Sequence, residues 1–423
     1  MAANSVAAGV LIARYLGADS LGVYLVLATA IQILIQIGGC GLHMTINYLT
    51  AGQPEKLIPA GVNAIGFGVI SGCICAGFLW IMSPGLLPGV PADLTLVGLV
   101  VVPFQVVTTM VISLFFAQGE IKKFNLIDLL NQSFVLVNAI TALVILGGGL
   151  WLLVSLNALA GVVVAVIALS LFYAYASRRF PERRWTGDRK LMGSMLRYSS
   201  RGFILWISTL LIYRFDLMIV NYFRGSTEAA VYAVATQCTM FLLLLPNVVS
   251  FVLQARVAAT QDAGGEFTAR VARHTSLILF VACLVTVPGA LAVAAVYGPG
   301  FEKLPLLCWI LLPGIFLVGV QSVISQYFVG TGMPMFLALA WVLTLVLSIL
   351  MNLAAVPRFG AVGAATVSSI CYAAISVAIF CFFHQKTGLG VRAILFPHVH
   401  ELRQLQKLLK ADAHDQNAER NIG

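Results

Sequence analysis

Apolar residues occur along this chain in long runs, separated by short segments that carry glycine, proline and charged side chains. A helix needs roughly 20 residues to cross about 30 Å of hydrocarbon, and several runs reach that length. Because the runs are apolar on every side, they predict spanning helices rather than the alternating strands of a transmembrane barrel. Twelve segments are predicted, near residues 2–15, 21–49, 57–82, 94–118, 125–147, 150–177, 198–222, 229–258, 272–297, 304–329, 334–356 and 361–384.

Composition supports a membrane protein and excludes several other classes. Hydrophobic residues make up 60% of the chain and charged residues 10%, whereas a soluble domain carries roughly 25% charged residues. The net charge of +9 comes from residues in short connectors and the tail, so no nucleic-acid partner is expected. The eight cysteines lie in apolar segments without Cys-x-x-Cys pairs, so neither disulfides nor a metal site are expected.

The distribution of lysine and arginine predicts how the chain is oriented. If the N-terminus is cytoplasmic, the connectors after even-numbered spans carry fourteen of these residues and the opposite side carries four. Cytoplasmic loops are enriched in such residues. We therefore expect a multi-pass protein of the cell (inner, cytoplasmic) membrane with both termini in the cytoplasm.

An internal repeat divides the chain into two halves. Arg14 to Gly17, followed by Tyr24, recurs 208 residues later as Tyr222 to Gly225, followed by Tyr232. A coincidence between apolar segments is the alternative. A true repeat predicts an all-α membrane fold with two six-helix lobes in parallel orientation around a central cavity.

The expected organisation is an N-terminal lobe at 1–177, a basic connector at 178–197, a C-terminal lobe at 198–384 and a tail at 385–423. Only thirteen residues precede Arg14, and that many helical residues rise about 20 Å, so the first helix is expected to be short. In the tail, residues 391–411 have the pattern of an amphipathic interfacial helix or of a solubilising tail, and the end is expected to be disordered.

Several motifs together carry a family resemblance: Arg14-x-Leu-Gly, Gly22-x-Tyr24, Arg214-x-Asp216, Phe223-x-Gly225 and Val231-Tyr232. In this order and spacing they resemble the multidrug/oligosaccharidyl-lipid/polysaccharide exporter superfamily, in its polysaccharide-biosynthesis branch. The resemblance implies a flippase that moves polyprenyl-diphosphate-linked oligosaccharide to the outer leaflet by alternating access. It also implies contact with membrane lipids and with polysaccharide assembly machinery. The segment Gln254-Ala255-Arg256 departs from the family pattern, which often has a proline there.

Polar residues in the second span form the first candidate for a substrate site. Gln32, Gln36, His43 and Asn47 fall within about 60° of arc if the helix is continuous. Such a stripe is expected either to line a cavity and bind sugar hydroxyls or to form hydrogen bonds between helices. His43 is also a candidate for proton coupling, although a histidine here is more often a hydrogen-bonding group.

Charged residues within or near spans form the second candidate set. Arg214 and Asp216 point about 200° apart on a helix, so they do not simply neutralise each other. In a flippase Arg214 would bind diphosphate or acidic sugars, and Asp216 would either join the cavity or form a structural pair. Arg201 and Arg256 would receive the incoming diphosphate or extend to lipid headgroups.

A looser polar stripe follows the fifth span, at Asp128, Asn131, Gln132 and Asn138. No Walker-type phosphate loop occurs in the sequence, and no cofactor is expected. Alternatives to a flippase are a multidrug or cation exporter, a membrane-embedded polysaccharide polymerase or ligase, and a non-transporting relative. The connectors on the outer side have about ten residues or fewer, which disfavours an enzyme because catalytic groups would need a larger loop, and no catalytic residue is predicted.

Overall fold

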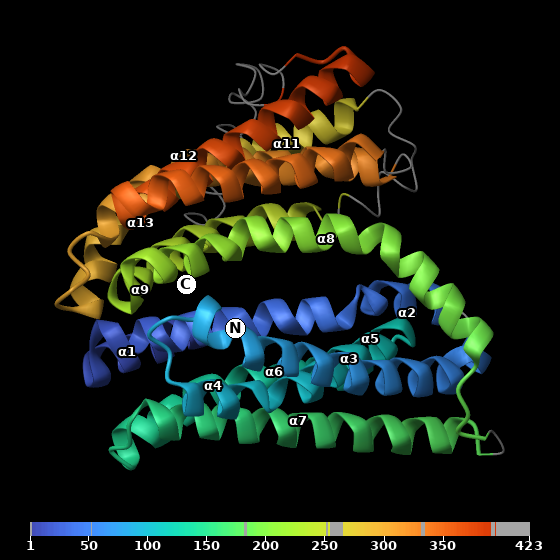
Figure 1. Ribbon diagram of the computed structural model, residues 1–423. Helices are drawn as coiled ribbons and strands as arrows, with labels where there is room; N and C mark the ends of the chain where they lie inside the picture. The colour runs from blue at the N-terminus through green and yellow to red at the C-terminus, as the bar shows by residue number, and fades with distance from the viewer. Residues whose placement is uncertain are drawn as a thin grey trace, which may run out of the picture. The chain divides into compact units, whose positions relative to one another are not determined.

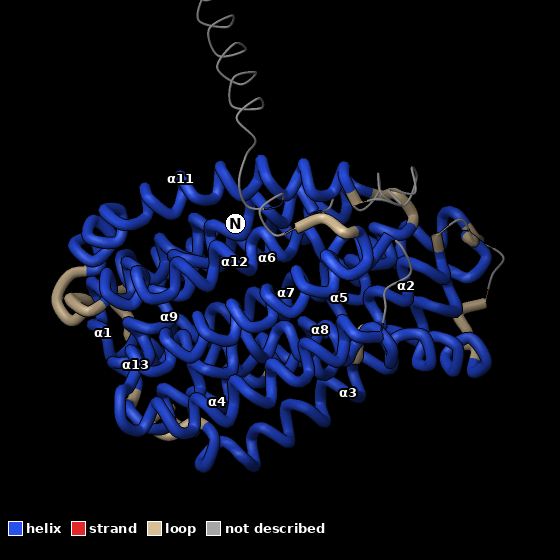
Figure 2. Tube along the Cα trace, turned by 90° about the horizontal axis from the view of Figure 1, so that it is seen from above, coloured by secondary structure: helices blue, strands red, loops and turns tan. Residues whose placement is uncertain are grey.

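The computed structural model describes residues 2–51, 53–181, 184–250, 253, 265–330, 335–390 and 394. Regular structure in these ranges is helical, and Figure 2 shows helices joined by short loops without a strand among them. Arg256 and the predicted tail helix, apart from Ile394, lie outside the described residues. For Arg201 the structure describes the backbone but not the side chain.

The first half of the chain contributes α1 (Ala2–Gly39), α2 (Leu42–Thr50), α3 (Leu57–Leu86), α4 (Ala92–Leu99), α5 (Val101–Ala117), α6 (Ile121–Ala139) and α7 (Leu150–Arg179). A π-helical turn (Ile140–Ile145) extends α6, and a short 3-10 turn (Pro54–Lys56) precedes α3. The second half contributes α8 (Arg189–Arg224), α9 (Ser226–Met240), a 3-10 turn (Phe241–Leu243), α11 (Glu266–Tyr297), α12 (Leu304–Gly330) and α13 (Met335–Thr387).

Ten helices in the described ranges are long and apolar enough to cross a membrane. Two of them, α1 and α13, contain a glycine with non-helical backbone angles: Gly17 (φ 84°, ψ 170°) and Gly360 (φ 60°, ψ −140°). Positive φ suits glycine because it has no Cβ. Each of these two helices therefore consists of two helical segments, and ten plus two gives the twelve segments expected from the sequence. The prediction of an all-α membrane protein with about twelve spans is confirmed.

The repeat expected from the sequence is visible in the backbone. Gly17 (φ 84°, ψ 170°) and Gly225 (φ 84°, ψ 174°) have nearly the same conformation, and each joins two helical segments. Gly22 lies so close to α9 that an added Cβ would be 1.9 Å from the carbonyl oxygen of Ser226. The Asp19 carboxylate accepts hydrogen bonds from the hydroxyls of Ser226 and Thr227. The two repeated connectors are thus in direct contact.

An arginine before each connector binds carbonyls at the end of another helix. Arg14 donates from Nε to the carbonyl oxygen of Val296 (2.7 Å) and from Nη2 to that of Ala295 (2.9 Å). These carbonyls are in the last turn of α11, where they lack intrahelical partners. The guanidinium therefore caps this helix end and offsets its partial negative charge.

Arg224 repeats this arrangement in the second half. It donates from Nε to the carbonyl oxygen of Val356 (3.3 Å) and from Nη2 to that of Arg358 (2.8 Å), just before the break at Gly360. On the other side of the break, the Glu228 carboxylate accepts from the backbone N–H of Ala361 (2.9 Å). The charged residues of the connectors thus complete the hydrogen bonding where α11 ends and where α13 is interrupted.

Contacts within the chain separate two compact units. The first comprises residues 1–237, 290–308 and 341–368, and the second comprises residues 238–289, 309–340 and 369–423. Within the first unit, α3 packs against α5, and α7 packs against α5 and α6 (Figure 1). Within the second unit, the Phe383 ring lies 5.2 Å from the Tyr327 ring and 6.2 Å from the Phe328 ring, between centroids. The lobe boundaries expected from the sequence stay a prediction.

Two glycines of α3 allow a matched test of the helix packing. A Cβ at Gly72 would lie 2.5 Å from the Cα of Pro103 in α5, whereas a Cβ at Gly77 meets nothing within 4 Å. We expect Gly72→Ala to lower thermal stability, because overpacking costs about 1–3 kcal/mol. Gly77→Ala is expected to leave it unchanged or raise it by about 0.5–1 kcal/mol. Thermal unfolding of the purified variants measures both, and equal effects would contradict the packing described.

Candidate functional site

Two residues of the polar stripe meet on one aromatic side chain of α8. The indole Nε1 of Trp206 donates to Oε1 of Gln36 (3.1 Å), and its ring lies edge-on to the imidazole of His43, with centroids 5.9 Å apart. We call Gln36, His43 and Trp206 the Trp206 cluster. Gln32 lies one turn before Gln36 on α1 and is exposed. The cluster therefore joins α1 to α8 through a hydrogen bond and α2 to α8 through an aromatic contact.

The single helical face expected for this stripe is interrupted. Cys40 and Gly41 both have positive φ (46° and 69°), and they separate α1 from α2. The rotation of 100° per residue therefore does not hold between Gln36 and His43. Asn47, further along α2, has a buried Oδ1 without a hydrogen-bond partner in the described part of the chain. The role of all four residues in substrate binding stays a prediction.

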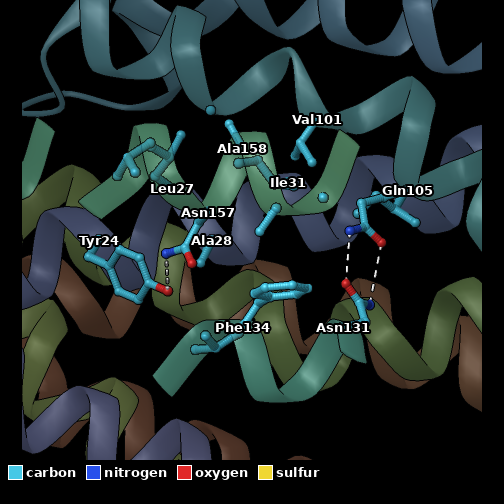
Figure 3. Close-up of a pocket in the computed structure, with 16 residues that line it drawn as sticks. Tyr24, Leu27, Ala28, Ile31, Val101, Gln105, Asn131, Phe134, Asn157 and Ala158 are labelled. Carbon is cyan, nitrogen blue, oxygen red and sulfur yellow. Dashed lines mark hydrogen bonds between the residues drawn. The ribbon is translucent and has the colours of Figure 1, made fainter. Parts of the chain in front are cut away.

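A cavity of about 260 Å³ lies inside the first unit, between α1, α5, α6 and α7 (Figure 3). We call it the amide cavity because two sets of amide side chains border its apolar walls. Gln105 Nε2 donates to Oδ1 of Asn131 (3.0 Å), and Asn131 Nδ2 donates back to Oε1 of Gln105 (3.5 Å). Figure 3 shows these two side chains facing each other at one side of the cavity.

The second set of amides connects three helices. Asn138 Nδ2 donates to Oδ1 of Asn157 (2.9 Å), and Asn157 Nδ2 donates to the hydroxyl of Tyr24 (3.4 Å). The walls between the two sets are apolar, with Leu27 and Ile31 from α1. A cavity with neutral polar groups and apolar walls suits an uncharged group, because no side chain in it can neutralise an ion.

Sequence reasoning found only part of this cavity. Asn131, which lines the cavity, and Asn138, which is hydrogen-bonded to the lining residue Asn157, belong to the predicted stripe on the fifth span, but Gln105, Asn157 and Tyr24 were not predicted as site residues. A signal was present, since Gln105 and Asn157 are isolated amides within apolar runs. Their pairing across helices was not predictable from spacing along one helix.

Asp216 has the contacts of a structural carboxylate. Its side chain is 3% exposed and accepts hydrogen bonds from the hydroxyls of Tyr232 and Ser368 (2.9 Å for Ser368) and from the backbone N–H of Leu217 (2.8 Å). These bonds tie α8 to α9 and to the second segment of α13. Whether Asp216 also takes part in a substrate site stays a prediction. Arg214, two residues earlier, is half-buried.

Residues suited to metal binding do not cluster in the ranges that the structure describes: no group of three or more histidine, cysteine, aspartate or glutamate side chains could hold an ion there. The candidate groups in the membrane-spanning part are therefore amides, aromatic rings, one imidazole and one guanidinium. Side chains of these types can form hydrogen bonds, and the guanidinium carries a positive charge.

Comparisons with known proteins give a family and a fold. Residues 8–257 match the model of a family described as polysaccharide biosynthesis protein. No curated protein matches the chain.

Among solved structures, an inward-facing multidrug resistance MATE family transporter of the MOP superfamily is 16% identical (TM-score 0.73), covering 91% of this chain and 94% of its own. Lipid II flippase MurJ in an inward closed conformation is 11% identical (TM-score 0.74), with coverage of 91% and 88%. An outward-facing MATE transporter is 14% identical (TM-score 0.63), with coverage of 91% of each chain. The chain shares the fold of these two-lobe transporters.

The bond between Asp216 and Ser368 can be tested with a double-mutant cycle. Asp216→Ala removes the acceptor of two buried hydroxyls, and a lost buried hydrogen bond costs roughly 1–3 kcal/mol. Ser368→Ala alone is expected to cost less, and the double variant should lose about 1 kcal/mol less than the sum of the two. Thermal unfolding of the purified proteins gives the three values. Strict additivity would show that the two side chains do not interact.

Proposed function

Since the chain belongs to the polysaccharide biosynthesis protein family, as the motifs in its sequence indicated, we propose that it moves a polyprenyl-diphosphate-linked oligosaccharide from the cytoplasmic to the outer leaflet. The transport cycle is alternating access between two lobes. The single observation that carries the proposal is the Trp206 cluster, with the exposed amide of Gln32 beside it. Placing polar side chains in the middle of a span costs free energy, and the side chains here are nevertheless only partly covered by protein.

The chemistry of the Trp206 cluster suits sugar hydroxyls. An amide and an imidazole each offer donor and acceptor atoms, and a hydroxyl group both donates and accepts. The indole of Trp206 is 40% exposed, so part of its apolar face is free for contact. The residues of the cluster are uncharged apart from the imidazole of His43, which can titrate.

A multidrug or cation exporter is the nearest alternative, because several structures with this fold are MATE transporters. An organic cation needs an acidic partner in a site that excludes water. Asp216 is buried beneath three hydrogen-bond donors, so it is poorly placed to bind a cation. The family match and the neutral amides therefore favour a sugar. Lipid II flippase MurJ, which shares the fold, provides a second parallel.

Within this proposal the arginines bind the diphosphate. Arg214 is half-buried in α8, and a guanidinium offers a fork of donors that matches phosphate oxygens. Arg201 and Arg256 would receive the diphosphate at the cytoplasmic side. This assignment depends on the orientation expected from the lysine and arginine count, with both termini in the cytoplasm and the protein in the inner membrane.

We propose a carrier rather than a polysaccharide polymerase or ligase. The solved structures that share the fold are transporters, and the candidate groups lie on membrane-spanning helices instead of a large loop. Polysaccharide assembly machinery is the expected partner on the outer side, because the flipped oligosaccharide must be consumed there.

Transport of a fluorescent polyprenyl-diphosphate-linked sugar in reconstituted vesicles tests the proposal. Trp206→Phe keeps a ring but removes the donor to Gln36, so we expect transport to fall about fivefold, the equivalent of ~1 kcal/mol. Trp80 is the matched control, since it is 39% exposed on α3, and Trp80→Phe should transport normally. An equal loss in both variants, or no transport of the sugar lipid by the unmodified protein, would contradict the proposal.

Arg214 gives a separate prediction about the diphosphate. Arg214→Gln should weaken the apparent affinity for the sugar lipid by at least about tenfold, since hydrogen bonds to charged groups contribute roughly 1.5–3 kcal/mol. Arg214→Lys keeps the charge but not the fork and should be intermediate. Competition with free polyprenyl diphosphate measures the affinity. Normal affinity in a well-inserted Arg214→Gln protein would remove this residue from the site.

A further inference from the structure

A pocket of about 470 Å³ lies at the C-terminal end of α7, apart from the Trp206 cluster and the amide cavity. We call it the basic pocket. Its lining combines three cationic side chains with an aromatic ring and two apolar side chains: Lys123, Arg178, Arg179, Tyr175, Leu171 and Ala174. An amphipathic lining of this kind suits a ligand with an anionic head and an apolar body.

The basic pocket has a net positive charge. Lys123 forms an ion pair with Glu120 (2.6 Å), and Arg178 and Arg179 are exposed in the last turn of α7. Three cations and one acid give +2. Among the residues that the structure describes, neither arginine has an acidic partner within ion-pair distance. Two guanidinium groups therefore remain available for an anion.

The position of Lys123 is fixed by aromatic rings as well as by its acid. Its Nζ lies 4.8 Å from the ring centroid of Tyr175 and 5.9 Å from that of Phe115. Cation–π contacts of this length are attractive by roughly 0.5–2 kcal/mol. The ammonium group is thus held against α7, beside the two arginines.

Neighbouring aromatic residues mark the depth of the basic pocket in the membrane. The ring of Trp185 stacks on Tyr173 (5.1 Å between centroids) and contacts Phe172 edge-on (5.9 Å). Tryptophan and tyrosine favour the interface between hydrocarbon and headgroups. The arginines therefore lie at headgroup level, while Leu171, about two turns earlier in α7, lies on the hydrocarbon side.

We propose that the basic pocket binds the phosphate headgroup of an anionic phospholipid. The guanidinium groups of Arg178 and Arg179 bind the phosphate oxygens, Lys123 supplies a further charge, and an acyl chain lies along Leu171 and Ala174. In the orientation proposed above, this end faces the cytoplasmic leaflet, where anionic lipids are concentrated. The site does not depend on transport of an oligosaccharide, so it stands or falls separately from the proposed function.

Native mass spectrometry of the purified protein tests the site, with dioleoyl phosphatidylglycerol as the probe and dioleoyl phosphatidylcholine as the neutral comparison. The double variant Arg178→Gln, Arg179→Gln should bind phosphatidylglycerol about thirtyfold more weakly, which corresponds to ~2 kcal/mol for two cations. Binding of phosphatidylcholine should not change. The charge-matched control is Arg189→Gln, Lys190→Gln, two exposed residues at the start of α8, and it should bind phosphatidylglycerol normally.

Three results would overturn the proposal. Equal loss of binding in the control variant would show a general charge effect. Equally tight binding of glycerol phosphate, which has no acyl chain, would show a site for free phosphate. Displacement of phosphatidylglycerol from the unmodified protein by polyprenyl diphosphate, together with loss of polyprenyl diphosphate binding in the double variant, would show that the pocket belongs to the transported lipid. Unfolding temperatures of the variants verify that each is folded.

Discussion

The structure depends on one constraint: a polar group inside an apolar helix must form hydrogen bonds or reach water, because leaving it bare in hydrocarbon costs several kcal/mol. Many hydroxyls within the spans meet this constraint by donating to a carbonyl of their own helix, and several amides and the Asp216 carboxylate meet it through partners on another helix. Gln105 and Asn131 pair with each other, and Asp216 accepts from Tyr232 and Ser368. These bonds select which helices pack together, because the apolar surfaces that face lipid do not favour one neighbouring helix over another.

The Trp206 cluster departs from that pattern, and the proposed function follows from the departure. Within the described part of the chain Gln36 has one hydrogen-bond partner, the indole of Trp206, and is half-buried, while Gln32 is exposed. Amides in this state are tolerated if they border water. At the repeated connectors, in contrast, Asp19 accepts from two hydroxyls, and Arg14 and Arg224 each donate to two backbone carbonyls. A carrier needs both arrangements. Polar side chains that border water line its passage, and hydrogen-bonded connectors close that passage at one end.

Much of this fold was predictable from the sequence because the bilayer imposes it. Apolar run length predicted the twelve segments, and the recurrence of Gly17 as Gly225 predicted two glycine-marked connectors, which the structure shows with nearly the same backbone angles. The break at Cys40 and Gly41 was not predictable, since cysteine rarely adopts positive φ. It invalidated the continuous face assumed for Gln36 and His43. Partners across helices, such as Trp206 for Gln36 and Asn157 for Asn138, depend on packing that no single-helix pattern contains.

The most direct test of a wet passage is the reactivity of a cysteine placed at Gln32. In a cysteine-free background, Gln32→Cys should react with a charged, membrane-impermeant thiol reagent, because only a thiol in water ionises and meets such a reagent. Ile74→Cys is the comparison, since Ile74 is 66% exposed on α3 among apolar neighbours and should stay unreactive in the bilayer. If the thiol at position 32 is as unreactive as the one at position 74, the amides border lipid or protein and the account of a carrier is wrong.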